Sequence, residues 1–200
     1  MTKRLRDETI YLAPQILGSR DLNGNPVIYD EKTNENLEPN NIDDKIKIYK
    51  RQVMEWFLNR ASRLLKGKNN GFIILMIATS YIEGVQQYMN GNTSNNHSKT
   101  TFRQGLRRIF ALDNVSDSLL NDFYQHVRCG LFHNGMSGDK VVISNDFLEP
   151  IAFPQNQTID INPRMFLTKI REDFSKYISI LKDTSNTNER RHFDNMFSVI

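Results

Sequence analysis

The chain has 200 residues, of which 38% are hydrophobic and 24% are charged. This balance is typical of a globular protein and excludes an intrinsically disordered chain, and the length is sufficient for one sizeable core. A formal net charge of +3 is too small to indicate nucleic-acid binding by itself, so such a function would depend on local basic clusters.

Cysteine and histidine usage gives no sign of a disulfide or a metal site. Cys129 is the single cysteine, and the four histidines have no cysteine partners at metal-ligand spacing. We therefore expect no metal and no cofactor. The N-terminus lacks the apolar run of a secretion signal, and the longest apolar stretch, 72–78, is too short to span a membrane, so the sequence predicts a cytoplasmic protein without membrane association.

Residues 1–42 carry frequent turn and breaker signals and predict an extended N-terminal arm. The signals are Pro14, Gly18, the run 21–26 and the run 38–41. Between them, 27–29 is a candidate short strand, and 10–12 is a candidate segment for docking on the main body.

Residues 43–182 are predicted to form a helical domain. Apolar residues at helical spacing indicate helices from Asp43 to about Gly67, from Phe72 to about Tyr88, from about Thr100, and from the Ser116-Asp117 capping signal. The second helix is apolar all round in its first half, which predicts that it is the most buried, and it carries Glu83. His133 is expected at or just beyond the last turn of the fourth helix.

A short β section and one more helix are expected after the fourth helix. Residues 140–143 and 158–161 are the two strand candidates of a small hairpin, and Asn162-Pro163 opens the last helix. Residues 183–200 are predicted to be a linker and an apolar tail, which either binds a partner or packs on the chain's own core. The predicted fold class is all-α, a bundle of about five helices with a small inserted β hairpin before the last helix.

The segment 128–134, Arg-Cys-Gly-Leu-Phe-His-Asn, is the best clue to function. An arginine can hold a phosphate through two fixed donors, and a histidine can move a proton near neutral pH. Arg128 and His133 together are suited to cleaving a phosphodiester without a metal.

The helix order, the buried helix ending in Tyr-Ile-Glu-Gly-Val and the Arg-x4-His motif resemble the HEPN superfamily over roughly residues 43–182. The resemblance implies a homodimer in which two motifs face each other and form a metal-independent ribonuclease site. His133 would act as general acid or base on the RNA 2'-hydroxyl, and Arg128 would stabilise the phosphorane, giving a 2',3'-cyclic phosphate. Glu83 and Asn134 would support them. Cys129 departs from the family, whose catalytic members commonly have a polar residue directly after the arginine.

A structural alternative and a second basic feature remain open. Arg128 could pair with Glu83 inside the bundle while His133 caps the helix C-terminus. The densest basic group consists of Lys99, Arg103, Arg107 and Arg108, which would either track an RNA backbone or form a solvated helix face.

These observations predict an RNA-directed, HEPN-like protein, with endoribonuclease activity in a defence or toxin-like role. The alternative is a non-catalytic interaction module that binds a protein partner through the N-terminal arm or the tail, 193–200. A nuclease should expose Arg128 and His133 in a positively charged cleft, whereas a module should bury Arg128 against Glu83.

Overall fold

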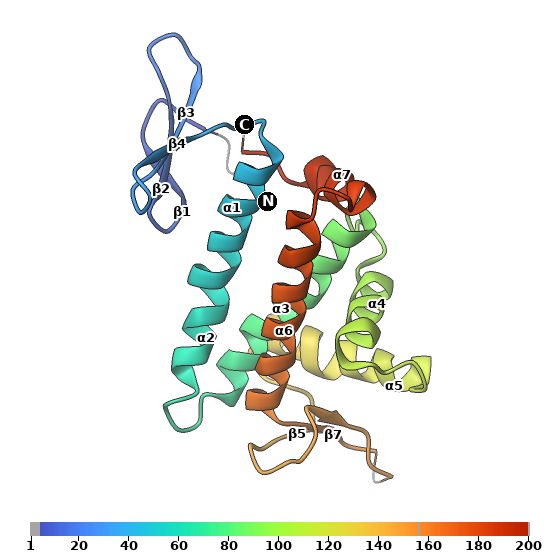
Figure 1. The fold of residues 1–200 in the computed structure, drawn as a ribbon. Coiled ribbons are helices and arrows are strands. Elements are labelled where there is room, and N and C mark those ends of the chain that lie inside the picture. The colour runs from blue at the N-terminus through green and yellow to red at the C-terminus, as the bar shows by residue number, and fades with distance from the viewer. Residues whose placement is uncertain (1–4, 156, 200) are drawn as a thin grey trace. The chain divides into compact units, whose positions relative to one another are not determined.

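The computed structural model describes residues 5–155 and 157–199 and combines helices with two β-sheets (Figure 1). The predicted all-α class is therefore wrong: a four-stranded antiparallel sheet lies near the N-terminus, and a three-stranded sheet precedes the last long helix. The chain divides into two compact units. Unit 1 includes residues 5–59, 88–92 and 176–199, and unit 2 includes 60–87, 93–155 and 157–175.

The sheet of unit 1 is an antiparallel meander within the segment predicted to be an extended arm. Its strands, in spatial order, are β1 (Ile10–Ala13), β2 (Ile16–Arg20), β3 (Pro26–Asp30) and β4 (Glu35–Leu37). The β2–β3 turn is set by its sequence, because the Asp21 carboxylate accepts hydrogen bonds from the backbone amides of Asn23 and Asn25. Gly24 there has a φ of 81°, which favours glycine.

A buried carboxylate connects this sheet to the first helix. Helix α1 (Ile42–Arg51) begins at Asn41, whose side chain accepts from the amides of Asp43 and Asp44, and it continues into the π-helix η1 (Gln52–Leu58). Asp30 at the end of β3 is fully buried, and Arg51 donates to its two oxygens at 2.5 and 2.8 Å. The Nζ of Lys47 lies 3.0 Å from the same carboxylate. The buried charge is thus paired on two sides.

The C-terminal segment packs on its own unit through aromatic rings. Helix α7 (Thr187–Met196) buries Phe193, whose ring centroid lies 5.4 Å from Tyr49 and 5.7 Å from Tyr88. Phe197 joins this cluster and is also buried. Burial raises the pKa of Tyr88 to about 12. Of the two fates predicted for the tail, the structure shows packing on the chain's own core; Ile200 lies outside the described residues.

Unit 2 has a helical core. Its helices are α2 (Asn59–Leu64), α3 (Gly71–Asn90), α4 (Ser98–Phe110), α5 (Asp117–Asp122), the π-helix η2 (Phe123–Asn134) and α6 (Pro163–Lys182); α2, α3 and α6 also contribute residues to unit 1. Phe102, Phe123 and Phe166 are fully buried, and Phe123 stacks on each of the other two at 6.2 Å. Thr79 and Ile82 of α3 are also fully buried.

The second sheet differs from the predicted hairpin. Strand β5 (Val141–Ile143) pairs in parallel with β7 (Ile159–Ile161), and β6 (Ile151–Ala152) pairs with β7 in antiparallel orientation. The two predicted strands are therefore neighbours, but they run in the same direction because the chain passes through β6 between them. The buried Asn162 side chain fixes this connection by donating to the carbonyls of Asn145 and Phe147.

Candidate functional site

The helix that carries Arg128 and His133 begins and ends at residues whose sequence explains the boundary. The Ser116 hydroxyl accepts from the amide of Leu119 and caps α5, which continues into η2. Gly135, with a φ of 70°, ends η2 directly after Asn134. His133 therefore lies in the last turn, as predicted.

The π-helical winding of η2 changes which residues share a side. In an α-helix, residues five apart are separated by about 140° around the axis. In a π-helix each amide bonds to the carbonyl five residues earlier, so residues five apart lie on adjacent turns and are separated by a much smaller angle than in an α-helix. Arg128 and His133 are five apart within η2, so the winding places both on about the same side of the helix.

Arg128 is held by one carboxylate and two rings. Its Nη2 donates to Glu83 Oε2 at 3.1 Å, and its guanidinium carbon lies 5.6 Å from the centroid of Tyr124 and 5.3 Å from that of Phe132. The side chain is 26% exposed. Within residues 5–155 and 157–199, Nε and Nη1 donate to no acceptor, so these two groups remain available to a phosphate.

Glu83 is the buried end of this contact. Its other oxygen, Oε1, accepts a hydrogen bond of 2.6 Å from the Ser94 hydroxyl, and its side chain is 12% exposed. The Arg128 guanidinium carbon lies over the Tyr124 ring; burial raises the pKa of Tyr124, and the Arg128 charge opposes that rise. The arginine is thus positioned from α3, from the loop before α4 and from η2 itself.

His133 and Asn134 are exposed at the end of η2. Neither side chain has a hydrogen bond or an ion pair with any part of the chain that the structure describes. Phe132 and Met136, close to them in sequence, are also exposed, at 43% and 57%. The chain then turns back on η2, where the amide of Gly138 donates to the His126 carbonyl at 2.8 Å.

The predicted basic group is largely engaged within unit 2. Arg103 and Arg107 both bind Asp117, at 2.8 and 2.5 Å, and the hydrogen bond from Arg107 lowers the pKa of Asp117. Arg107 also donates to three carbonyls of the loop after α4. Arg108 binds Asp173 and Gln86 Oε1. Only Lys99 of the four is exposed and has no partner among the described residues.

Sequence reasoning brought Arg128 and Glu83 together but missed three residues of the site. Tyr124 and Phe132 lie four residues before and after Arg128, and this spacing could have indicated aromatic neighbours on a helix. Ser94 lies in the polar loop before α4, and no local pattern indicates that it would reach Glu83.

In residues 5–155 and 157–199, no three His, Cys, Asp or Glu side chains gather in a way that could hold a metal ion. No helix in these same ranges has both the length and the apolar character needed to cross a bilayer.

In comparisons with known proteins, no family model, no curated protein and no solved structure matches this chain.

Proposed function

We propose that the chain is a HEPN-like, RNA-directed protein that cleaves RNA phosphodiesters without a metal, using Arg128 and His133. The observation that carries the proposal is the arrangement on η2. A partly exposed guanidinium lies on about the same side of a π-helix as an exposed histidine. Its Nε and Nη1 donate to no acceptor among the described residues.

The residues divide the chemistry between them. The His133 imidazole takes the proton of the 2'-hydroxyl, whose oxygen attacks the adjacent phosphorus. Arg128 donates to the non-bridging oxygens, where negative charge grows in the transition state. The bond from phosphorus to the 5'-oxygen breaks, the leaving oxygen takes up a proton, and a 2',3'-cyclic phosphate remains.

Positioning of the arginine supports this role. Glu83 and the two flanking rings restrict the guanidinium, so less side-chain entropy is lost when it binds a phosphate. By the HEPN resemblance, a second copy of the chain would supply a facing motif and with it a second imidazole to protonate the leaving oxygen.

Cleavage of a structured RNA pool in excess chelator tests the proposal. The wild type should cut and leave 2',3'-cyclic phosphate ends, detected by mass spectrometry, and His133→Ala should lose the cutting while remaining folded. His97→Ala is the matched control, because His97 is also exposed and its side chain makes no capping bond at the start of α4. Equal cutting by wild type and His133→Ala would contradict the proposal.

A toxin-like or defence role makes a separate prediction in cells. Induced expression of the wild type should arrest growth, and His133→Ala should remove the arrest at equal protein level. Arrest by both variants would separate toxicity from the proposed chemistry.

A second candidate is a non-catalytic HEPN-like interaction module. The ion pair between Arg128 and Glu83, completed by the Ser94 hydroxyl, favours it, because these groups would then maintain the helix packing of unit 2. No cutting by wild type across varied RNA pools, together with a large loss of stability on breaking this pair, would favour the module.

A further inference from the structure

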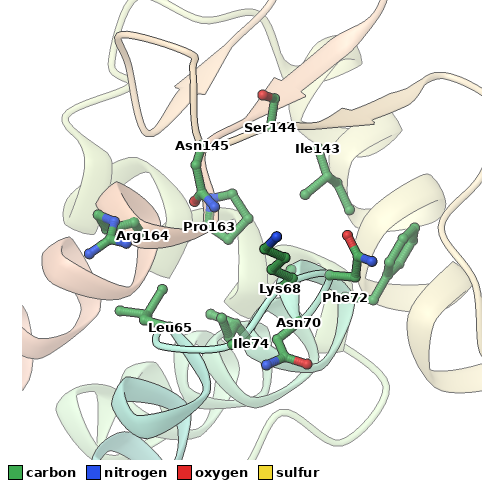
Figure 2. Close-up of a pocket in the computed structure, with 13 residues that line it drawn as sticks. Leu65, Lys68, Asn70, Phe72, Ile74, Ile143, Ser144, Asn145, Pro163 and Arg164 are labelled. Carbon is green, nitrogen blue, oxygen red and sulfur yellow. The ribbon is translucent and has the colours of Figure 1, made fainter.

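A pocket of about 620 Å³ lies within unit 2 and shares no residue with η2. It is formed by the loop before α3 and the first turn of α3, the end of β5 and the start of α6 (Figure 2). Its volume is in the range of pockets that bind small organic ligands. Gly71 keeps these segments close, since a side chain there would come within 2.9 Å of Ile143 and 3.2 Å of Pro163.

The charge of the pocket has one sign. Lys68 and Arg164 are the charged residues among the described residues that line it, and no acidic side chain is among them. Both are exposed, and neither side chain has an ion pair or hydrogen bond to any residue in 5–155 and 157–199. Figure 2 shows the Lys68 side chain extending toward the space beside Asn145 and Ile143, with Arg164 at the edge. An anion is the ligand that this charge would attract.

The other lining residues have apolar and amide side chains, which suit a ligand that carries an organic group as well as an anionic one. Apolar wall is supplied by Leu65, Phe72, Ile74, Ile143 and Pro163. Asn69, Asn70 and Asn145 add amide groups, of which the Asn70 Nδ2 already donates to the Leu64 carbonyl. Apolar surface with a ring can stack on a base, amides can pair with its polar edge, and a lysine can bind a phosphate.

The pocket of unit 1 lacks this one-sided charge. It measures about 780 Å³, but Asp43, Asp44 and Glu55 line it together with its lysines. The pocket beside Lys68 is therefore the better match for a phosphorylated ligand.

We propose that the pocket formed by Lys68, Phe72, Asn145 and Arg164 binds a nucleotide unit, with Lys68 on the phosphate and the apolar wall against the base. The ligand is either a free nucleoside monophosphate or one nucleotide of an RNA strand, which share this chemistry. The proposal is independent of cleavage by Arg128 and His133.

Calorimetric titration of the full chain with AMP, GMP, CMP and UMP tests it, with adenosine and inorganic phosphate as partial ligands. At least one monophosphate should bind at least about tenfold more tightly than either partial ligand, since a charge-assisted hydrogen bond and base stacking each contribute. Lys68→Glu should weaken that binding by about tenfold or more, and Arg164→Glu should weaken it less. Lys66→Glu is the control, because Lys66 is exposed nearby but does not line the pocket, and it should bind as the wild type does.

A 2'-O-methyl hexaribonucleotide, which cannot be cleaved by its own 2'-oxygen, distinguishes the two sources. Tighter binding of the hexamer than of the monophosphates, lost in Lys68→Glu, identifies an RNA strand; binding of monophosphates alone identifies a free nucleotide. The proposal is overturned if neither binds, if adenosine or phosphate alone binds as tightly as every monophosphate, or if Lys66→Glu weakens binding as much as Lys68→Glu. All variants should unfold at the same denaturant concentration as the wild type, because both lysines and Arg164 are exposed.

Discussion

Arg128 and Glu83, 45 residues apart in the sequence, meet at 3.1 Å between Nη2 and Oε2. The contact leaves the guanidinium partly exposed while its carboxylate partner is nearly buried. One contact would therefore serve both proposed functions: it connects α3 to η2, and it orients a cation on η2 five residues before His133.

Glu83→Gln should destabilise the protein by about 1–3 kcal/mol, because Arg128 then loses its charged partner while remaining partly buried. Glutamine keeps the length of the side chain and an oxygen for Ser94, but an NH2 group replaces the oxygen that accepts from Arg128, so the change removes both the charge and this acceptor. Urea unfolding followed by circular dichroism measures the difference.

The exposed pair Lys169 and Glu172 is the matched control. Its atoms are also 3.1 Å apart, but both side chains are about half exposed. Glu172→Gln should therefore change stability by less than about 0.5 kcal/mol. Equal effects of the two substitutions would show that burial does not increase the contribution of the Glu83–Arg128 pair to the free energy of unfolding.

The helices were predictable where local chemistry sets their ends. Ser116 caps α5, Asn162 accepts from the amide of Met165 at the start of α6, and the apolar run from Phe72 lies in α3, as the sequence predicted. Capping and apolar periodicity are local signals, so they can be recognised in the sequence without knowledge of the tertiary structure.

The sheet topology and the contacts of the basic group were not predictable from local signals. Strand β6 has two residues, too few for a pattern, and its presence turns the predicted hairpin into a parallel pair of β5 and β7. Within 10–37 the turns were predicted and the candidate strand 27–29 lies in β3, but strands of three to five residues gave too little alternation for the sequence to predict the other three. Asp117 engages Arg103 and Arg107 across a chain reversal that sequence spacing does not show.

Asp30 should make stability depend on acid pH. Burial alone would raise its pKa, but hydrogen bonds from Arg51 and Lys47 more than offset burial, so the pKa lies well below its ordinary value of 3.8. A carboxyl group whose pKa is lower in the folded state than in the unfolded state stabilises the folded protein. This contribution is complete at pH values above the pKa of the unfolded state, and it is lost as the pH falls through the pKa of the folded state.

The advantage of the wild type over Asp30→Asn in unfolding free energy should therefore be greatest above about pH 5 and shrink as the pH falls below about 4. Urea titrations at several pH values measure it. Glu31→Gln, one residue further along the chain and exposed, is the control and should follow the wild type across the whole range. A constant difference for Asp30→Asn would rule out the paired carboxylate as its source.

Phe193→Ala should destabilise the protein by about 3–5 kcal/mol, because a fully buried ring in contact with Tyr49 and Tyr88 is replaced by a cavity. Phe57, which is 47% exposed, provides the control, and Phe57→Ala should cost less than about 1 kcal/mol. Chemical unfolding of both variants tests whether the C-terminal segment is part of the core in solution. A small effect of Phe193→Ala would instead favour a tail that is free to bind a partner.

Two helical glycines of unit 2 should respond to alanine in opposite directions. A Cβ at Gly84 in α3 would have no heavy atom of the described residues within 4 Å, so Gly84→Ala should stabilise by about 0.5–1 kcal/mol through helix propensity alone. A Cβ at Gly105 in α4 would lie 2.8 Å from the Ile82 carbonyl oxygen, a backbone atom that cannot move without displacing α3. Gly105→Ala gains the same propensity but must separate the two helices, so we expect a net loss of about 1–3 kcal/mol. Stabilisation by both substitutions in thermal or urea unfolding would show that α3 and α4 do not approach each other at Gly105.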